Sequence, residues 1–486
     1  MNYKDINTIA GLKKSGYTVK SIKQELRDNL VEKLSSAEPI FEGIVGYDET
    51  VIPQLTSAIL SKHNINLLGL RGQAKTRIAR SLVNLLDDYI PFVEGSEIND
   101  DPFNPLSKYA VDLINSKGDE TPISWLHKSK RFFEKLATPD VTVADLIGDV
   151  DPIKAANLKL SYADERVIHY GMIPRANRCI FVINELPDLQ ARIQVSLFNI
   201  LQEGDIQIRG FQVRLPLDLQ FIFTANPEDY TNRGSIVTPL KDRIGSQILT
   251  HYPLSIEIAK EITRQEVKIS NHLDDAIYVP DLARILIEQI GFEARNSEFI
   301  DSKSGVSARM SITMFENLVS TAEMRLIKSK EKSTSIRMSD FLGITPAITG
   351  KVELVYEGEQ EGAENVAAIL LGDAIKTVFN NHFRAIKKLA KPGTVDEFDA
   401  VISWFAENKQ YELPNQCSNA AYAKALNSVT PLNKILESYI PDAAEKDKLI
   451  LKEFLLWGLA EYKKLSKNEY SNGISFGDDL LNSLFN

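Results

Sequence analysis

The chain has 486 residues, of which 43% are hydrophobic and 25% are charged. This composition is ordinary for a globular protein and excludes a largely disordered chain, a collagen-like repeat and a disulfide-stabilised scaffold. The 66 acidic and 56 basic residues give a formal net charge of -10, which argues against a general nucleic-acid coat protein. With two cysteines, Cys179 and Cys417, the fold does not depend on disulfides, and a reducing compartment is expected.

The chain starts with a charged segment that has helical periodicity. In residues 1–38 the apolar positions Ile22, Leu26, Leu30 and Leu34 recur at helical spacing and predict an amphipathic packing helix, with a partner-contacting arm as the alternative. No long apolar run follows the first lysines, and no stretch reaches 18 uninterrupted apolar residues. We therefore expect a cytoplasmic protein without a membrane partner.

Three short apolar segments predict buried parallel strands. They are Asn66–Leu70, Cys179–Asn184 and Leu219–Thr224, each bounded by polar residues or glycine and followed by a turn. The first two also lead into segments with helical periodicity. This pattern is typical of a layered α/β domain with a parallel sheet between helices.

Beyond residue 253 the sequence is mostly helical. Residues 351–356 alternate like one strand, and the Gly- and acid-rich residues 357–365 are expected to form a hinge. The periodic segments that predict helices are Ile256–Ile269, Ser311–Ile327, Val366–Phe383 and Ala443–Leu465. The predicted divisions are an N-terminal helical extension (1–38), an α/β domain (39–253), a helical domain (254–350) and a mostly helical C-terminal region (351–486).

The first predicted strand leads into a candidate phosphate-binding loop. Residues 69–76 read GLRGQAKT and follow the pattern of glycine, four residues, then Gly-Lys-Ser/Thr, except that Ala74 replaces the second glycine. In such a loop Lys75 would neutralise phosphate oxygens and Thr76 would offer its hydroxyl to Mg²⁺. Ala74 weakens the motif because alanine tolerates unusual backbone angles less well than glycine, although Gly72 offers some freedom. A strand–helix turn followed by a surface lysine is the alternative.

The second predicted strand ends in a polar pair. Asn184 and Glu185 stand where an acidic pair would hold the metal and orient the attacking water. Asn184 can bond a metal-bound water but brings no charge, so Glu185 is the candidate base. Asn226, after the third strand, could position water against a γ-phosphate. For the Asn184–Glu185 pair, a buried strand with a polar end is the alternative.

Taken in order, these motifs resemble those of the AAA+ ATPases, and within them the magnesium-chelatase ATPase-subunit and MoxR-like group. The resemblance spans about residues 41–327 and rests on seven segments: IVG (44–46), GLRGQAKT (69–76), GMIPRANRCIFVINEL (171–186), LFNILQEGDIQIRG (197–210), FTANPEDY (223–230), TPLKDRIG (238–245) and GVSARMS (305–311). It implies an α/β AAA+ P-loop core with a parallel sheet, a helix-2 insert at 158–170, a hairpin at 204–214 and a helical lid at 254–350.

The resemblance also implies which residues hold ATP and Mg²⁺. Thr76 and Asn184 match the metal positions. The residues that match the adenine pocket and the phosphate loop are Val45, Gly46, Gly69, Gly72, Gln73, Ala74, Lys75, Thr76 and Arg77.

Four further residues match the catalytic positions of the family. They are the Walker B base Glu185, sensor 1 Asn226, the arginine finger Arg243 and sensor 2 Arg309. A finger that reaches into a neighbouring subunit's site implies self-association into a ring or another oligomer. Proteins of this group often work with a partner that carries a von Willebrand A domain.

The resemblance implies an ATPase that remodels a partner protein or assists metal-cofactor insertion. Ala74 and Asn184 depart from the motifs, so an active but slow enzyme is expected. The first alternative is a nucleotide-binding, hydrolysis-deficient assembly protein. The second is a DNA-directed AAA+ machine, against which stand the net acidic charge and the lack of a GAFTGA-type loop.

The long spacing between the phosphate loop and Glu185 indicates an insertion at about 94–145. Its acidic residues, Glu94, Glu97, Asp100 and Asp101, are interpreted as a solvated or partner-docking loop, with a cation site as the alternative. The basic residues 126–133 (LHKSKRFF) are interpreted as an exposed helix face, with a nucleic-acid contact as the alternative. The six histidines are scattered and do not predict a zinc site.

Overall fold

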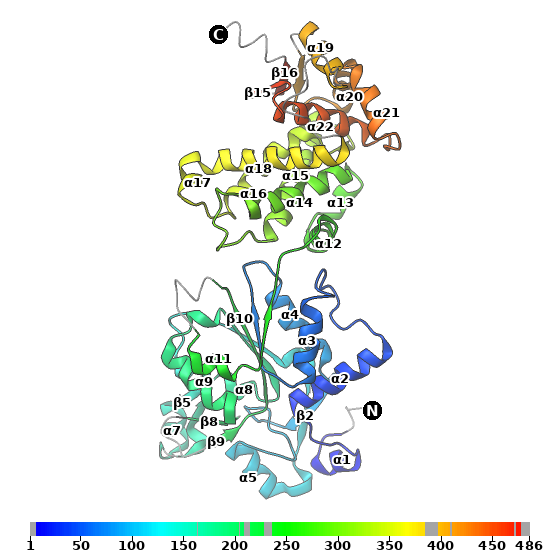
Figure 1. Cartoon of the computed structure of the whole chain (residues 1–486). Helices are drawn as coiled ribbons and strands as arrows, with labels where there is room; N and C mark the ends of the chain where they lie inside the picture. Colours follow the sequence, from blue (N-terminus) through cyan, green and yellow to red (C-terminus); the bar gives the residue numbers. More distant parts are fainter. Residues whose placement is uncertain are drawn as a thin grey trace. The chain divides into compact units, whose positions relative to one another are not determined.

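The computed structural model describes residues 6–162, 164–203, 205–208, 214–227, 236–383, 397–408, 411–470 and 473–477. The chain divides into two compact units, Met1–His251 and Tyr252–Asn486, here called the α/β unit and the helical unit (Figure 1). Each unit is described by itself. Within the described residues, no helix combines the length and the apolar character that a membrane crossing requires.

The α/β unit is built on a five-stranded parallel sheet. In spatial order its strands are β11 (Ser246–Leu249), β1 (Ile65–Leu68), β10 (Leu219–Ala225), β7 (Cys179–Asn184) and β4 (Phe132–Leu136). The three strands predicted from the sequence are β1, β7 and β10, and β10 lies between the other two. The predicted α/β fold class with a parallel sheet is therefore confirmed.

Helices cover both faces of this sheet, so the inner strands β1, β10 and β7 bury both of their own faces, whereas the edge strands β11 and β4 are partly exposed (Figure 1). Along β7, Ile180 and Val182 pack into one core, whereas Cys179, Phe181 and Ile183 pack into the other, as strand alternation requires. The first core is completed by α2 (Ile22–Ser36), α3 (Val51–Leu60) and α4 (Lys75–Ser81). The second is completed chiefly by α8 (Met172–Arg175), α9 (Ala191–Glu203) and α11 (Thr238–Arg243).

The N-terminal segment packs against the α/β unit. It contains α1 (Ile9–Lys14) and α2, and the side chains of Ile22, Leu26 and Leu30 are buried as the packing interpretation predicts. Leu34 is exposed. The carboxylate of Glu25, also on α2, is buried and forms a bidentate ion pair with Arg131, with distances of 2.6 and 2.7 Å.

The predicted insertion at 94–145 is partly wrong, because β4 lies inside it and forms an edge of the central sheet. The same region holds an antiparallel pair, β2 (Tyr89–Val93) with β3 (Ile123–His127), and the helices α5 (Lys108–Lys117) and α6 (Val143–Leu146). The predicted exposed helix face at 126–133 is also wrong. Its Arg131 is buried because a carboxylate 106 positions away neutralises it, which the local sequence does not reveal.

The solvated-loop interpretation of the acidic segment at 94–101 is half right, because Glu94 and Glu97 are exposed whereas Asp100 and Asp101 are buried. Asp100 is buried and accepts hydrogen bonds from the backbone N–H groups of Leu106 and Ser107. Asp101 is buried beside Arg178, at 3.0 Å. In the described part of the chain no group of three or more His, Cys, Asp or Glu side chains could hold a metal ion, so neither a cation site here nor a zinc site elsewhere is supported.

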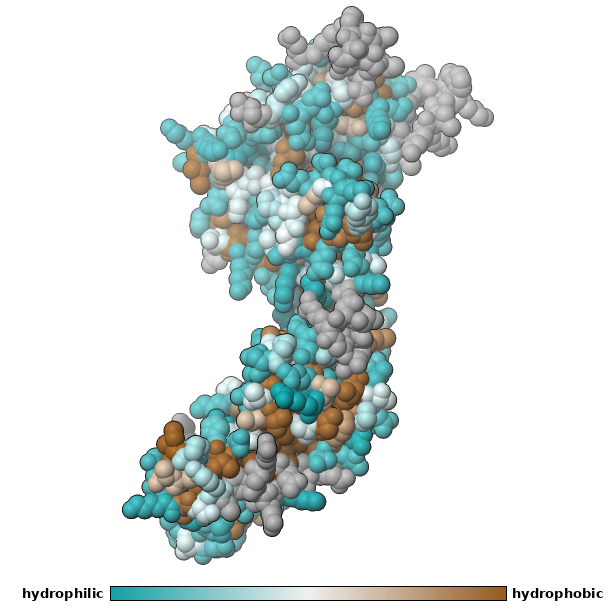
Figure 2. Space-filling view, turned by 90° about the vertical axis from the view of Figure 1, so that its left-hand side faces the viewer, coloured by the Kyte–Doolittle hydropathy of each residue, from teal (hydrophilic) through white to brown (hydrophobic). Residues whose placement is uncertain are grey.

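Two small antiparallel ribbons lie where the resemblance implies the insert and the hairpin. One pairs β5 (Gly148–Val150) with β6 (Ile168–Tyr170), with α7 (Pro152–Leu158) between them in the chain. The other pairs β8 (Asp205–Gln207) with β9 (Arg214–Pro216), whereas residues 204 and 209–213 of the predicted hairpin lie outside the described residues. The first ribbon exposes Ile153, Leu158 and Tyr162. Figure 2, which looks onto the side where Figure 1 places α7, shows hydrophobic groups among hydrophilic ones.

The helical unit has one continuous hydrophobic core, from Leu273 to Phe476. Its helices are α12 (Ile256–Glu266), α13 (Asn271–Asp274), α14 (Asp281–Asn296), α15 (Arg309–Ser329), α16 (Thr345–Thr349), α17 (Tyr356–Glu361), α18 (Ala363–His382), α19 (Asp399–Glu407), α20 (Asn419–Ser428), α21 (Pro431–Tyr439) and α22 (Lys448–Glu461). Its strands are the pair β12 (Ile277–Tyr278) and β13 (Thr334–Ser335), and the sheet β14 (Tyr411–Pro414), β16 (Gly473–Gly477) and β15 (Ser466–Tyr470).

Two sequence predictions in this unit are wrong. Residues 351–356 do not form a strand beyond one isolated bridge between Leu354 and Ile300, and Tyr356 already begins α17. Residues 357–365 are not an open hinge, because α17 and α18 occupy nearly all of them and meet at Gly362. Gly362 has a φ of 90°, so a glycine makes the sharp turn between two helices, and the acidic side chains face solvent on them.

Candidate nucleotide-binding site

The predicted motif residues of the α/β unit meet at one edge of the sheet. The loop 69–74 follows β1, Asn226 follows β10 and Glu185 follows β7. Because these strands are parallel neighbours, with Leu68 beside Ala225 in the register, their carboxyl ends lie side by side. The connections from β1 and from β10 lead to opposite sides of the sheet, since, among the strands of this sheet, β1 is followed in the chain by β4 at one edge and β10 by β11 at the other. Ligands of open α/β sheets bind at such a topological switch point.

The loop after β1 has the backbone that its glycines predict. A Cβ on Gly69 would overlap Oγ1 of Thr250 and Oε1 of Gln73, so glycine is required there. Gly72 has a φ of 74°. Ala74 has a φ of 55° and precedes the first residue of α4, so an alanine adopts the left-handed conformation at the position where the motif has glycine. This conformation costs an L-residue roughly 1–2 kcal/mol.

Lys75 joins the loop to the neighbouring strand. Its ammonium donates hydrogen bonds to the carbonyl oxygens of Gly69 and Leu70, and to Oδ1 of Asn226 at 2.7 Å. Thr76, the next residue on α4, is half-buried. The structure therefore brings together the predicted phosphate-binding lysine, the predicted metal-binding hydroxyl and the predicted sensor 1.

The side chain of Gln73 supports the loop from behind. It is buried, and its Oε1 accepts a hydrogen bond from the Thr250 hydroxyl at 2.7 Å, so any contact with a nucleotide would come from the backbone of Gln73. The single hydroxyl hydrogen of Tyr47 is shared between the carbonyl oxygens of Gln73, at 3.0 Å, and His251, at 2.7 Å. The sequence analysis missed Tyr47, although its place directly after the Val45–Gly46 pair was a usable signal.

The predicted adenine segment lies beside the start of α4. Gly43 has a φ of 74°, and a Cβ on it would meet the guanidinium of Arg77 at 2.9 Å. Gly46 also has a positive φ, of 80°, so two glycines bend this segment. The turn 43–46 thus lies against Arg77 and leads into Tyr47, whose hydroxyl bonds the phosphate loop.

Asn184 uses both ends of its amide. Its Nδ2 donates to Oε1 of Glu134 at 2.6 Å, and its Oδ1 accepts from the hydroxyl of Thr224 at 3.0 Å. The same hydroxyl accepts from the backbone N–H of Glu185 at 3.2 Å, and Glu185 has a φ of 56°. From the neighbouring strand, Thr224 therefore fixes the side-chain amide of Asn184 and the backbone of Glu185.

Glu134 was not predicted, and it adds a carboxylate to this edge of the sheet. It lies on β4, and its Oε2 accepts from Nη2 of Arg80 on α4 at 2.7 Å. Because both ends of the Asn184 amide are bonded within the chain, the oxygens that this edge offers are the Glu134 carboxylate and the Thr76 hydroxyl, which are donors of the kind that Mg²⁺ prefers. The residues present therefore fit a Mg²⁺ ion. Bound there, the ion would neutralise phosphate charge.

Arg243 lies at the end of α11 and contacts its own chain. Its guanidinium donates to Oε1 of Gln202, at 2.9 and 2.7 Å, and to the carbonyl oxygen of Pro239 at 2.8 Å. It also lies over the ring of Phe198. Arg309 is the first residue of α15 in the helical unit, so its predicted role as sensor 2 stays a prediction.

Cys179 is a core residue, as predicted. It is fully buried on β7, and this burial raises the pKa of its thiol to about 12. At neutral pH the thiol is therefore protonated and is not a nucleophile.

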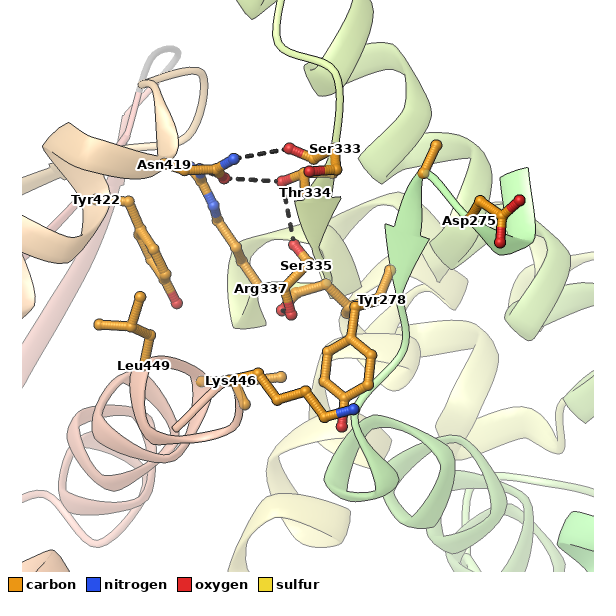
Figure 3. Close-up of a pocket in the computed structure, with 13 residues that line it drawn as sticks. Asp275, Tyr278, Ser333, Thr334, Ser335, Arg337, Asn419, Tyr422, Lys446 and Leu449 are labelled. Carbon is orange, nitrogen blue, oxygen red and sulfur yellow. Dashed lines mark hydrogen bonds between the residues drawn. The ribbon is translucent and has the colours of Figure 1, made fainter. Parts of the chain in front are cut away.

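The helical unit contains a cavity of about 430 Å³, which none of the sequence-predicted site residues lines. Several of the polar side chains in its wall, among them Asn419 and Thr334, are hydrogen-bonded (Figure 3). Asn419 accepts from Thr334 at 3.0 Å and from Arg337 at 3.1 Å, and the guanidinium of Arg337 stacks on Tyr422. These pairings serve the packing of the unit.

Comparisons with known proteins agree with this geometry. Residues 123–244 match the model of the AAA domain (dynein-related subfamily). The chain is 24% identical to the magnesium-chelatase 38 kDa subunit of Cereibacter sphaeroides over 237 residues, which cover 48% of this chain and 65% of that protein. It is 26% identical to the chloroplastic magnesium-chelatase subunit ChlI of Oryza sativa subsp. indica over 213 residues, which cover 42% of this chain and 47% of that protein.

A similar solved structure is the complex between subunits BchI and BchD of magnesium chelatase. It is 18% identical, with a TM-score of 0.34, and the match covers 66% of this chain and 98% of that one. The chain thus spans less than two thirds of the length of the curated relatives that it matches.

The parallel sheet, the loop after β1 and the polar pair after β7 define the α/β unit as an AAA+ domain. Within this class, the chain is similar to the magnesium-chelatase subunits. The resemblance to magnesium-chelatase-like AAA+ ATPases seen in the sequence is confirmed, whereas the roles of the individual site residues stay predictions.

Proposed function

We propose that this protein binds ATP and Mg²⁺ at the edge of the sheet formed by β1, β10 and β7, and that it hydrolyses ATP slowly. The observation that carries the proposal is the hydrogen bond between Lys75 and Asn226, because it unites the phosphate loop with the sensor position of the next strand. When ATP binds, the Lys75 ammonium would leave Oδ1 of Asn226 and the carbonyl oxygens of Gly69 and Leu70, and would bind the β- and γ-phosphates instead.

Hydrolysis requires a base beside the bound phosphates, and Glu185 is our candidate. Thr224 holds its backbone, so the carboxylate is carried on a fixed strand end rather than on a loose loop. Asn226 would orient the attacking water from β10. The slow rate follows from Asn184, which contributes no charge at the metal position, and from the strain at Ala74.

Arg243 leads us to propose that the complete site forms between copies of this chain. Within the chain its guanidinium bonds Gln202, so it must leave that partner to act as a finger on a neighbour's phosphate. An arginine supplied in this way is worth about 10³–10⁵-fold in rate. Self-association into a ring or another oligomer is part of this proposal.

The use of the turnover is proposed from the relatives. Remodelling of a partner protein, or assistance to metal-cofactor insertion, would fit an AAA+ protein related to magnesium-chelatase subunits. A partner with a von Willebrand A domain is proposed on the same basis.

A second candidate function is a nucleotide-binding assembly protein that does not hydrolyse ATP. The neutral Asn184 favours it, because both ends of its amide are bonded within the chain. In this alternative ATP would hold subunits together without being consumed.

The test compares the wild type with Glu185→Gln and Arg243→Ala at concentrations where the protein assembles. We expect all three to bind a fluorescent ATP analogue, and we expect phosphate release from the wild type only. If neither the wild type nor Glu185→Gln releases phosphate while both still bind the analogue, the result would support the non-hydrolysing assembly protein. A wild type that does not bind the analogue would contradict both.

A further inference from the structure

Glu134 stands where the missing charge of the Walker B motif is needed. It lies on β4, the strand next to β7, two residues before the position that pairs with Asn184. The glutamate side chain is long enough to reach across these two residues, since its Oε1 lies 2.6 Å from Nδ2 of Asn184. The carboxylate therefore lies at the end of β7 although its backbone belongs to another strand.

The contact with Asn184 explains why position 184 is neutral. An aspartate there would place a second carboxylate within hydrogen-bond distance of Glu134, and the repulsion between the two negative charges would disfavour the ionised form of one of them. Glu134 and Asn184 together carry one negative charge, the same as the single aspartate of the family motif. In this chain the negative charge is on Glu134 of the neighbouring strand β4, and the amide of Asn184 stands at the position where the family motif has aspartate.

The other oxygen of Glu134 faces the helix that carries Thr76. Oε2 accepts from Nε and Nη2 of Arg80, at 3.2 and 2.7 Å. Thr76 and Arg80 are four residues apart on α4, so they share one face of this helix and lie one turn from each other. Glu134 is thus bracketed by Asn184 on the sheet and by the Thr76 face of α4.

The bond to Arg80 does not withdraw Glu134 from other ligands. The side chain of Arg80 is 63% exposed, and exposed ion pairs are weak and exchange readily. The Glu134 side chain is 24% exposed, so its carboxylate is accessible but partly desolvated, which strengthens its attraction to a cation.

We propose that Glu134 supplies the carboxylate charge of the Mg²⁺ shell that Asn184 lacks. This inference rests on the proposed function, because it concerns the ion that accompanies ATP. It predicts that a divalent cation binds when either position 134 or position 184 carries a carboxylate, whichever of the two it is.

The test measures binding of Mn²⁺, a probe for Mg²⁺, by electron paramagnetic resonance in the presence of a non-hydrolysable ATP analogue. Glu134→Gln keeps an acceptor for the Asn184 amide, removes the charge, and places an NH₂ group where Oε2 accepts from the exposed Arg80. We expect it to lower Mn²⁺ affinity by about 10–100-fold, the effect of losing a shell partner, while metal-free analogue binding stays at the wild-type level.

The double variant Glu134→Gln with Asn184→Asp exchanges the charge and the amide between the two positions. We expect it to recover Mn²⁺ affinity, because the carboxylate returns to the family position. Failure of this recovery, or unchanged Mn²⁺ affinity in Glu134→Gln, would overturn the inference. A wild type that does not bind the analogue would instead overturn the proposed function, and this inference with it.

A variant that leaves Glu134 intact tests the inference even if Glu134→Gln does not fold. Arg80→Gln removes the competing cation and is expected to raise Mn²⁺ affinity several-fold. The matched control is Lys135→Gln, which removes one positive charge as Arg80→Gln does. Lys135 follows Glu134 in the chain but lies on the opposite face of β4, so this variant is expected to have little effect. Equal effects of the two variants would contradict a specific role for Glu134.

Discussion

The ammonium of Lys75 and the amide oxygen of Asn226 lie 2.7 Å apart, although 151 positions separate them in the chain. The bond closes the phosphate loop against the end of β10. Since the ammonium also bonds the carbonyl oxygens of Gly69 and Leu70, phosphate oxygens must compete with three acceptors for it.

This competition makes the two partners separable. We expect Asn226→Ala to keep or raise affinity for an ATP analogue by up to about tenfold, because one charged hydrogen bond no longer competes, and to abolish turnover. Lys75→Ala should lower the affinity by at least about tenfold, since a bond to a charged group contributes about 1.5–3 kcal/mol. Analogue titration and phosphate release measure both. An equal loss of affinity in the two variants would show that Asn226 binds nucleotide directly.

Replacing Ala74 with glycine should relieve the left-handed backbone at the start of α4. The relief of about 1–2 kcal/mol is partly offset by the greater freedom of glycine in the unfolded chain, which leaves a gain of about 0.5–1 kcal/mol. We expect the melting temperature of the α/β unit to rise by roughly 1–3 °C. Ala79→Gly is the control, because Ala79 is helical and buried. It should lose stability. A fall in both variants would refute strain at Ala74.

The buried pair of Glu25 and Arg131 anchors α2 to the start of β4. Arg131→Met should lower the free energy of unfolding by about 3–5 kcal/mol, because a buried carboxylate is left without its partner. The double variant with Glu25→Gln should recover much of this loss. The exposed pair of Lys13 and Asp119 is the control, and Lys13→Ala should change stability by less than about 1 kcal/mol. Urea denaturation measures all of these, and equal effects at the two pairs would contradict the role of burial.

Asp218 gives the stability of the α/β unit a component that falls as pH rises. Desolvation raises the pKa of Asp218 to about 6 in the folded chain, although the backbone N–H of Ile22 donates to it. The folded state therefore holds a proton that the unfolded state has lost between about pH 4 and pH 6. This contribution is complete below pH 4 and disappears as pH passes 6.

We therefore expect Asp218→Asn to gain stability relative to the wild type by about 3 kcal/mol between pH 4 and pH 7. Thermal unfolding at several pH values measures the difference. A difference that is constant over this range would show that Asp218 does not carry the titration.

Local patterns gave the sequence analysis its successes. β7 and β10 were found because buried parallel strands are continuous apolar runs, and α12, α15 and α18 because their apolar faces repeat at helical spacing. The phosphate loop was found because its chemistry needs residues adjacent in the chain. Residues 351–356 were misread because a short alternating segment next to a helix does not reveal that it has no partner strand.

The missed residues act through contacts that are distant in the chain. Glu134 shows no motif, and its meaning depends on the parallel register that sets it beside Asn184, 50 positions later. Arg131 looked exposed because its neutralising carboxylate is on α2. Tyr47 matters because it bonds a loop 26 positions away.

The sequence by itself determined the order of the motifs and hence the class of the domain, since both depend on residues close together in the chain. Tertiary structure alone decided that a carboxylate from an edge strand faces Asn184, that Arg243 bonds Gln202 of its own chain, and that a buried ion pair holds the N-terminal helix. Pairing between strands and the burial of charge are properties of the folded chain, because each requires partners that only folding brings together.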